Sequence, residues 1–192
     1  MLNTLISDSA EYVNEVVIGM AHRGRLNVML NVLGMPTAEL VREFTGDKVM
    51  STSGDVKYHL GYSINRKIAG KLVHVSLAYN PSHLEAIYPV VLGNCRARID
   101  QQDKIATLPI LIHGDASLSG QGVVMECLNM AYVPAYRVGG SIHIVVNNQI
   151  GFTAEAVDGR SSRYCTDIGK FIGAPVLHVH ADYPESVYRC AV

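Results

Sequence analysis

Short apolar runs rich in valine and isoleucine recur along the chain, and each is followed by a turn and then by a stretch with helical spacing. This alternation is typical of a parallel β-sheet whose strands are joined by crossover helices. The expected strands are residues 15–20, 71–79, 105–112, 141–147 and 174–180. The sequence therefore predicts an α/β fold built on a parallel sheet.

The segments between these runs carry the apolar spacing of helices. Leucine and methionine recur three and four residues apart in residues 25–34, which end at a glycine. Further helices are expected at residues 37–44, 84–100, 122–132 and 183–192. Residues 46–70 and 151–165 are polar and longer than ordinary connections, which is typical of functional loops.

The composition is that of a globular protein and gives no electrostatic reason to expect binding to nucleic acid or membranes. Of the 192 residues, 48% are hydrophobic and 17% are charged, and the net charge is −1. No apolar run approaches the roughly 18 residues that a membrane span requires. Four widely spaced cysteines fit reduced thiols in a cytosol-like compartment.

We expect one domain over residues 1–192, cut from a longer protein. Residues 183–192 have the pattern of a helix without a stop signal, which indicates truncation at the C-terminus, and we expect truncation at the N-terminus as well. The N-terminal residues lack the basic and apolar regions of a secretory signal. The expected compartment is a bacterial-like cytoplasm, or the mitochondrial matrix if a leader has been removed.

Two polar side chains follow neighbouring apolar runs at the point where ligands gather in an open parallel sheet, beyond the carboxyl ends of the strands. Asp115 follows residues 105–112, and Asn148 follows residues 141–147. A carboxylate, an amide oxygen and a backbone carbonyl suit Mg²⁺, which usually completes its octahedron with phosphate oxygens and water. The sequence therefore predicts a phosphorylated ligand bound through a metal, whereas the simplest alternative is that Asp115 caps a helix.

The pair Gly114-Asp115, followed by Asn147-Asn148, resembles the thiamine-diphosphate motif, usually written GDG…NN. Six longer blocks, in order along the chain, resemble the E1 component of 2-oxoglutarate dehydrogenase, a family in which GDA is the usual form. The blocks are GMAHRGRLNV (19–28), SGDVKYHLG (53–61), NPSHLEA (80–86), HGDASLSGQG (113–122), VVNNQIGFT (145–153) and YCTDIGK (164–170). The resemblance implies the thiamine-diphosphate-binding fold, of which this chain would form the half that binds the diphosphate.

The resemblance also implies how the cofactor is bound. Asp115 and Asn148 would bind Mg²⁺ through side-chain oxygens and Ile150 through its backbone carbonyl, and all three would thereby hold thiamine diphosphate. Arg23 matches a position that contacts the cofactor, as suits a guanidinium at a strand end.

Other positions match the family's thiamine and substrate sites. Ser82 and Leu84 match positions lining the thiamine site. His22 and His59 match the active-site histidines, which engage the 2-oxo acid and its intermediates.

The remaining histidines are not assigned to catalysis by the motifs. His83 and His113 lie in loops or at strand ends and could be structural or functional. We interpret the four others as structural: His74, His143, His178 and His180. In the loop after residue 153, Ser161, Ser162 and Arg163 are expected to be solvated.

The resemblance implies thiamine-diphosphate-dependent oxidative decarboxylation of 2-oxoglutarate in the tricarboxylic acid cycle. The succinyl group would pass to lipoamide on an E2 dihydrolipoyl succinyltransferase, and the intact enzyme would be a homodimer. A second domain would supply the glutamate that acts on the aminopyrimidine, since neither Glu85 nor Glu126 matches that role. The 192 residues alone are therefore expected to have little or no activity.

Three alternatives remain open from the sequence. An E1 component for 2-oxoadipate would have closely similar blocks. A non-catalytic domain could keep a Mg²⁺-diphosphate site. A nucleotide-binding α/β domain is disfavoured, because the chain contains neither G-x-x-x-x-G-K-[ST] nor G-x-G-x-x-G.

Overall fold

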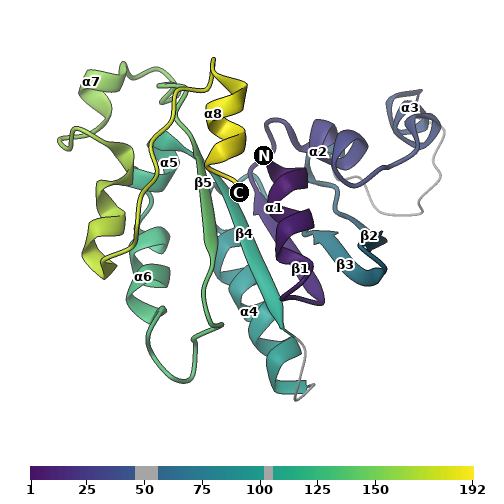
Figure 1. The fold of residues 1–192 in the computed structure, drawn as a ribbon. Coiled ribbons are helices and arrows are strands. Elements are labelled where there is room, and N and C mark those ends of the chain that lie inside the picture. Colours follow the sequence, from purple (N-terminus) through teal and green to yellow (C-terminus); the bar gives the residue numbers. More distant parts are fainter. Residues whose placement is uncertain (46–55, 102–105) are drawn as a thin grey trace.

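A five-stranded sheet crosses the molecule in the order β2-β3-β1-β4-β5 (Figure 1). The computed structural model describes residues 1–45, 56–101 and 106–192. The strands are β1 (Glu15–Met20), β2 (Tyr62–Ile68), β3 (Lys71–Leu77), β4 (Thr107–Gly114) and β5 (Ile142–Val146). The pairs β1–β3, β1–β4 and β4–β5 are parallel, and β2 runs antiparallel to β3. The predicted α/β fold is confirmed, and the sheet, predicted to be parallel, is parallel except at β2.

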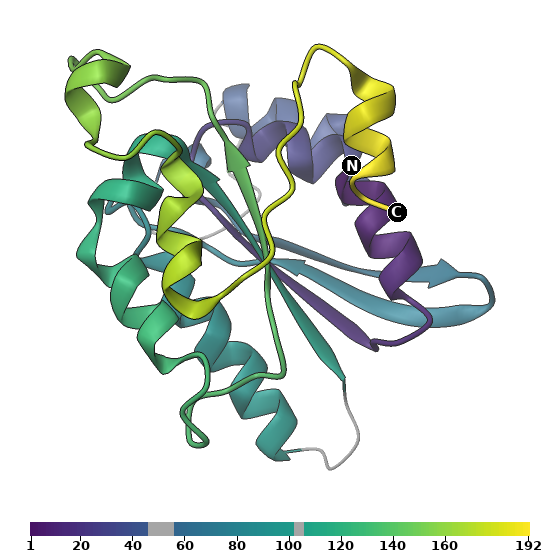
Figure 2. The same cartoon turned by 60° about the vertical axis from the view of Figure 1, so that its left-hand side comes forward.

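Helices cover both faces of the sheet. Figure 2 shows α4 and α6 on one side and α1 with α2 on the other. The α-helices are α1 (Leu2–Ser9), α2 (Arg25–Asn31), α3 (Thr37–Thr45), α4 (Ile87–Gln101), α5 (Asp115–Gly120), α6 (Gly122–Met130), α7 (Ala156–Gly159) and α8 (Pro184–Arg189). Two 3-10 helices are η1 (Lys57–His59) and η2 (Cys165–Ile172). Among the described residues, no helix combines the length and the apolar character needed to cross a membrane.

Strand β1 is buried on both faces, so it contributes to two separate cores. Val16 and Ile18 pack with residues of α1 and α2, whereas Val17 packs with residues of α4 and α6. A Cβ atom added at Gly19 would lie 2.8 Å from Cγ2 of Val91, a residue of α4. The absence of a side chain at Gly19 therefore allows α4 to lie close against the sheet.

One loop prediction and one strand prediction are wrong. Strand β2 lies inside residues 46–70, which the sequence indicates as a polar loop, because this edge strand has few apolar side chains to reveal it. Residues 174–180 form no strand, and the apolar side chains of Val176 and Leu177 are exposed. Residues 46–55 of the loop and Ile105 of the expected strand 105–112 lie outside the described residues.

The five expected helices are confirmed: α3 ends one residue later than expected, and the other four are shorter than expected. The sequence does not predict α1, α5 or α7, all of which are short. In particular, α5 begins at Asp115 directly after β4, ahead of the expected helix that begins at Gly122. All four cysteines are free, as expected for reduced thiols.

A buried arginine connects three segments at the carboxyl edge of the parallel strands. Arg25, the first residue of α2, is fully buried. Its Nη1 donates hydrogen bonds to the carbonyl oxygens of Leu60 (2.8 Å) and Ala78 (2.7 Å), and its Nη2 donates to that of Met20 (2.7 Å). Met20 is the last residue of β1, Leu60 precedes β2, and Ala78 follows β3. One guanidinium therefore fixes the chain at three strand ends.

The charge of Arg25 makes these contacts energetically important. Burial lowers the pKa of Arg25 to about 10, so the side chain stays charged at neutral pH. A buried charge is costly unless polar groups surround it, and hydrogen bonds to a charged donor are stronger than neutral ones.

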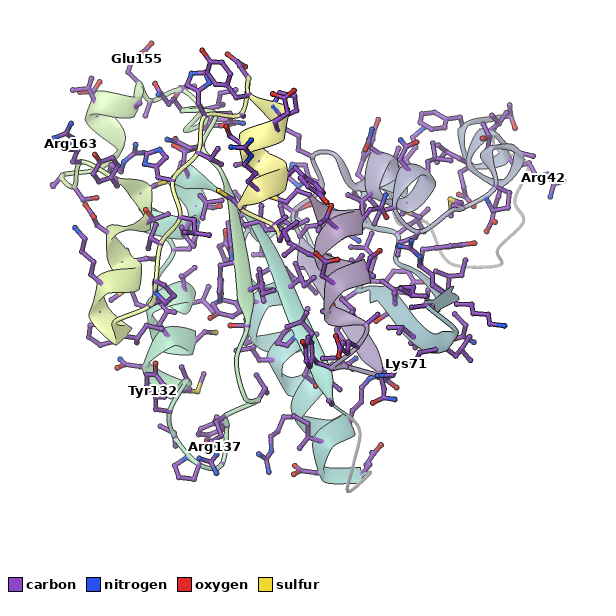
Figure 3. All side chains as sticks on the ribbon, viewed as in Figure 1. Arg42, Lys71, Tyr132, Arg137, Glu155 and Arg163 are labelled. Atoms are coloured by element: carbon purple, nitrogen blue, oxygen red, sulfur yellow. The ribbon has the colours of Figure 1, made fainter. Side chains whose placement is uncertain are left out.

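We predict that Arg25→Met lowers the free energy of unfolding by about 3 kcal/mol or more. The physical reason is that each carbonyl left buried without a donor costs about 1–3 kcal/mol. The measurement is urea denaturation followed by circular dichroism. The control is Arg42→Met on α3, where the side chain extends from the outer edge of the molecule (Figure 3) and a change within about 0.5 kcal/mol is expected. Equal losses in the two variants would contradict the role given to Arg25.

Candidate functional site

The residues predicted to form the site all lie at one edge of the sheet. They follow the carboxyl ends of β1, β3, β4 and β5 or precede β2, whose antiparallel direction brings its start to the same edge. The residues placed in this way are His22, Arg23, His59, Ser82, Leu84, Asp115, Asn148 and Ile150. The fold thus gathers residues from five segments at the edge where an open parallel sheet binds ligands.

The segments of Asp115 and Asn148 lie side by side. Strands β4 and β5 pair in parallel, with Gly114 opposite Val146, so both residues follow neighbouring strand ends. A Cβ atom built on Gly151 would lie 3.6 Å from the Cβ atom of Ala116. The turn after Asn148 therefore lies against the first turn of α5, the helix that begins at Asp115.

The carboxylate of Asp115 is buried, and only one of its oxygens is paired within the described residues. Its Oδ2 accepts a hydrogen bond from Nη1 of Arg160 at 3.1 Å. Its Oδ1 is buried and has no hydrogen-bond partner among the described residues. A buried carboxylate oxygen without a partner is costly, which makes it a natural place for a cation. Since the side chain contacts Arg160, helix capping alone does not account for Asp115.

The turn that carries Ile150 is shaped by Asn148. The Oδ1 atom of Asn148 accepts a hydrogen bond from the backbone N–H of Ile150 at 3.0 Å. Gln149 and Phe152, on either side of Ile150 and Gly151, both have φ of 59°. Non-glycine residues in this left-handed region carry strain, and such strain is concentrated at functional sites. The amide oxygen of Asn148 and the carbonyl of Ile150 thus belong to one short, constrained turn.

Another part of the site brings together two predicted residues from distant segments. The Nε2 atom of His59 lies 3.1 Å from Oγ of Ser82, and the carbonyl of His59 accepts a hydrogen bond from the backbone N–H of Asn80 at 3.3 Å. His22 and Arg23 are exposed in the loop between β1 and Arg25. The contacts of Arg25 with the chain beside His59 and beyond β3 therefore hold these segments at the same edge.

A buried carboxylate, which the sequence analysis leaves without a role, lies between the loop of Ser82 and the start of α5. Oε2 of Glu85 lies 2.6 Å from Nδ1 of His113, and Oε1 accepts a hydrogen bond from Oγ of Ser117 at 2.6 Å. All three side chains are buried. His113, left open by the sequence, is thus a buried, hydrogen-bonded residue at the end of β4.

The polar contacts continue from His113 into β5. Nε2 of His113 lies 2.9 Å from Nδ1 of His143, and Nε2 of His143 lies 2.8 Å from Oγ of Ser141 and 3.3 Å from the hydroxyl of Tyr88. Burial, followed by the neighbouring His113, lowers the pKa of His143 to about 4. His143 is therefore neutral at physiological pH, with polar partners at both ring nitrogens, as expected of a structural histidine.

The arginine that contacts Asp115 is Arg160, a residue that no sequence motif singles out. Arg160 makes that contact, whereas Arg163 and Glu155 lie at the outer edge of the molecule (Figure 3). The guanidinium carbon of Arg163 lies 5.4 Å from the ring centre of Tyr164. Arg163, Ser161 and Ser162 are exposed, as expected of a solvated loop. No sequence signal distinguishes Arg160, because its partner is 45 residues away.

Two cavities lie at the opposite edge of the sheet. One has a volume of about 490 Å³ and is lined by residues of α4 and α6 together with Arg137, which lies far from Glu155 and Arg163 in Figure 3. The other, of about 450 Å³, is lined by residues near the starts of β4 and β5. Neither cavity is lined by a predicted site residue.

The described residues also contain no cluster of three His, Cys, Asp or Glu side chains suited to a metal. The predicted ligand set has a different composition, with one carboxylate, one amide and one carbonyl.

Comparison with known proteins identifies the family of the chain. A family model described as dehydrogenase E1 component matches residues 3–191. The 2-oxoglutarate dehydrogenase E1 component of Cupriavidus necator is 54% identical over 180 residues, which cover 91% of this chain and 19% of that protein. The proteins of the same name from Coxiella burnetii (53% identity, 91% and 19% covered) and Azotobacter vinelandii (51%, 97% and 20%) are similarly related. The chain spans about a fifth of the length of these curated relatives. It belongs to the dehydrogenase E1 component family.

Proposed function

We propose that this chain is the part of a 2-oxoglutarate dehydrogenase E1 component that binds Mg²⁺ and the diphosphate of thiamine diphosphate. The whole enzyme would oxidatively decarboxylate 2-oxoglutarate and transfer the succinyl group to lipoamide on an E2 dihydrolipoyl succinyltransferase. The observation that carries this proposal is that Oδ1 of Asp115 is buried and has no hydrogen-bond partner among the residues that the structure describes, while Asn148 follows the neighbouring strand end. The names of the relatives support the choice of substrate.

The available oxygens fit a magnesium ion. Asp115 would contribute Oδ1, Asn148 its side-chain oxygen and Ile150 its backbone carbonyl. The oxygen of Asn148 keeps a second lone pair after it accepts the N–H of Ile150. Arg160 would remain on the other oxygen of Asp115 and hold that carboxylate in place. An all-oxygen set with few protein groups is typical of Mg²⁺ bound together with phosphate.

The remaining residues at this edge would bind the organic groups. Arg23, exposed after β1, suits a contact with the diphosphate. Ser82 and Leu84 would line the thiamine site, where Leu84 offers an apolar side chain that is 38% exposed. His22 and His59 would form hydrogen bonds with the 2-oxo acid. Bound thiamine diphosphate supplies the electron sink that loss of CO₂ requires.

The site needs further protein to be complete. A sheet with one binding edge holds one end of the cofactor, so a second domain of a homodimeric enzyme would hold the aminopyrimidine. The 192 residues alone, taken as a single domain, are therefore expected to have little or no activity. We place the enzyme in the bacterial cytoplasm, since the relatives named above come from bacteria, with the mitochondrial matrix as the alternative for a protein that carries a leader.

We predict that Asp115→Ala in the whole enzyme weakens the binding of thiamine diphosphate in the presence of Mg²⁺. Substitution of a residue that only hydrogen-bonds to a metal ligand typically weakens metal binding by about tenfold to hundredfold. Loss of a carboxylate that binds the metal itself should weaken binding by at least as much. The measurement is isothermal titration calorimetry on the cofactor-free enzyme. The exposed Asp8→Ala on α1 is the control and should bind like the unchanged enzyme. An unchanged affinity in Asp115→Ala would mean that Asp115 has only a local structural role.

We predict a higher kcat/KM for 2-oxoglutarate than for 2-oxoadipate. A difference of one methylene group in a binding pocket is worth about 1–3 kcal/mol, so the two values should differ by roughly 10- to 200-fold. The measurement is CO₂ release by the whole enzyme with an artificial electron acceptor. A preference for 2-oxoadipate would identify the alternative substrate. Tight cofactor binding without turnover of either acid would instead favour a non-catalytic Mg²⁺-diphosphate domain.

A further inference from the structure

We propose that Glu85 is a positioning residue that fixes Asp115 relative to the loop of Ser82 and Leu84. The inference rests on the proposed function, because it concerns how the metal-binding carboxylate is held in place. Glu85 does not contact Asp115. It acts through His113 and Ser117, the residues two positions before and two positions after Asp115.

Glu85 forms hydrogen bonds with residues that precede and follow Asp115 in the chain. One carboxylate oxygen lies 2.6 Å from Nδ1 of His113 at the end of β4, and the other accepts the hydroxyl of Ser117 in α5 at 2.6 Å. Strand β4 ends at Gly114 and α5 begins at Asp115, so these two bonds span the junction between the strand and the helix. The position of Asp115 at this junction therefore depends on a single buried carboxylate.

The backbone of Glu85 itself, in the loop between β3 and α4, is also constrained. Glu85 has φ of 69°, a left-handed conformation that costs a residue with a side chain about 1–3 kcal/mol and persists only where the surrounding structure enforces it. Its carbonyl accepts a hydrogen bond from the backbone N–H of Tyr88 at 2.9 Å, which connects the loop to the start of α4. Leu84, which is expected to line the thiamine site, directly precedes this fixed point. Glu85 thus connects the loop of Leu84, expected at the thiamine site, to the strand–helix junction of Asp115, the proposed metal ligand.

The reach of the side chain, rather than its negative charge, is what this role requires. The substitution Glu85→Gln keeps the length: the new amide oxygen could accept the N–H of His113, and the new NH₂ group could donate to Ser117. Ser117 can accept this bond because its hydroxyl also has the carbonyl of Gly114 as an acceptor, at 3.2 Å. The substitution Glu85→Asp keeps the charge but shortens the side chain by a methylene group, so the carboxylate could not reach both partners. A purely electrostatic role predicts the reverse order of the two variants.

The test compares Glu85→Asp with Glu85→Gln in the whole enzyme, with Mg²⁺ and thiamine diphosphate as the probes. The apparent Kd for Mg²⁺ is measured by calorimetry at a fixed, saturating concentration of thiamine diphosphate. Glu85→Asp should weaken binding about tenfold or more, as is typical when a group that orients a metal ligand is displaced, whereas Glu85→Gln should stay within about threefold. The matched controls are Glu126→Asp and Glu126→Gln at an exposed position of α6, which should leave the Kd unchanged.

Three results would overturn the inference. The first is an unchanged affinity in Glu85→Asp, including the case in which only the melting temperature falls. The second is a larger loss in Glu85→Gln than in Glu85→Asp. If Glu85→Asp does not fold, Ser117→Ala removes one of the two bonds and should still weaken Mg²⁺ binding. Unchanged binding by a folded Ser117→Ala protein is the third.

Failure of this inference is distinguishable from failure of the proposed function. If Asp115→Ala loses affinity for the cofactor and Glu85→Asp does not, Asp115 binds the metal without the help of Glu85. If Asp115→Ala binds normally, the proposed metal site itself is wrong.

Discussion

A carboxylate oxygen buried without a partner is unfavourable, and the candidate site is organised around one such atom. This is Oδ1 of Asp115, which has no hydrogen-bond partner in the described part of the chain. The oxygen lies at the junction of β4 and α5, beside the end of the parallel strand β5. Any cation that binds there would gain an anionic ligand already removed from water. The ion pair with Arg160 occupies the second oxygen and leaves the first available.

Two buried polar groups hold the surroundings of this oxygen in place. Arg25 donates to carbonyls that adjoin β1, β2 and β3, and Glu85 binds His113 and Ser117 around the end of β4. Both are charged residue types in positions where an unpaired charge would be costly, so their bonds restrict the backbone strongly. The residues expected to touch ligands therefore follow or precede strand ends that are tied together by buried hydrogen bonds, although several of these residues lie in exposed loops.

The parallel sheet and the location of the site could be predicted from the sequence because they depend on local patterns. Buried parallel strands are continuous apolar runs, and the polar residues that follow them lie at the ligand-binding edge. The edge strand β2 has no such run and is missed. The run at residues 174–180 has the composition of a strand, but it is not part of the sheet of the described chain.

The residues that support the site could not be predicted, because their partners are far away along the chain. Arg25 bonds to a carbonyl 53 residues away, Glu85 to a histidine 28 residues away, and Arg160 to a carboxylate 45 residues away. A charged residue in a helical pattern or in a polar loop is ordinarily solvated. Only the three-dimensional structure distinguishes these three from exposed neighbours such as Arg23 and Arg163.

The most direct test of the account is a crystal structure of the whole enzyme with thiamine diphosphate and Mn²⁺ in place of Mg²⁺. The anomalous signal of manganese locates the ion independently of any assumption about its ligands. We predict one peak per subunit at about 2.1 Å from Oδ1 of Asp115, the side-chain oxygen of Asn148 and the carbonyl oxygen of Ile150. A peak bound by other residues, with Asp115 still paired only to Arg160, would contradict it.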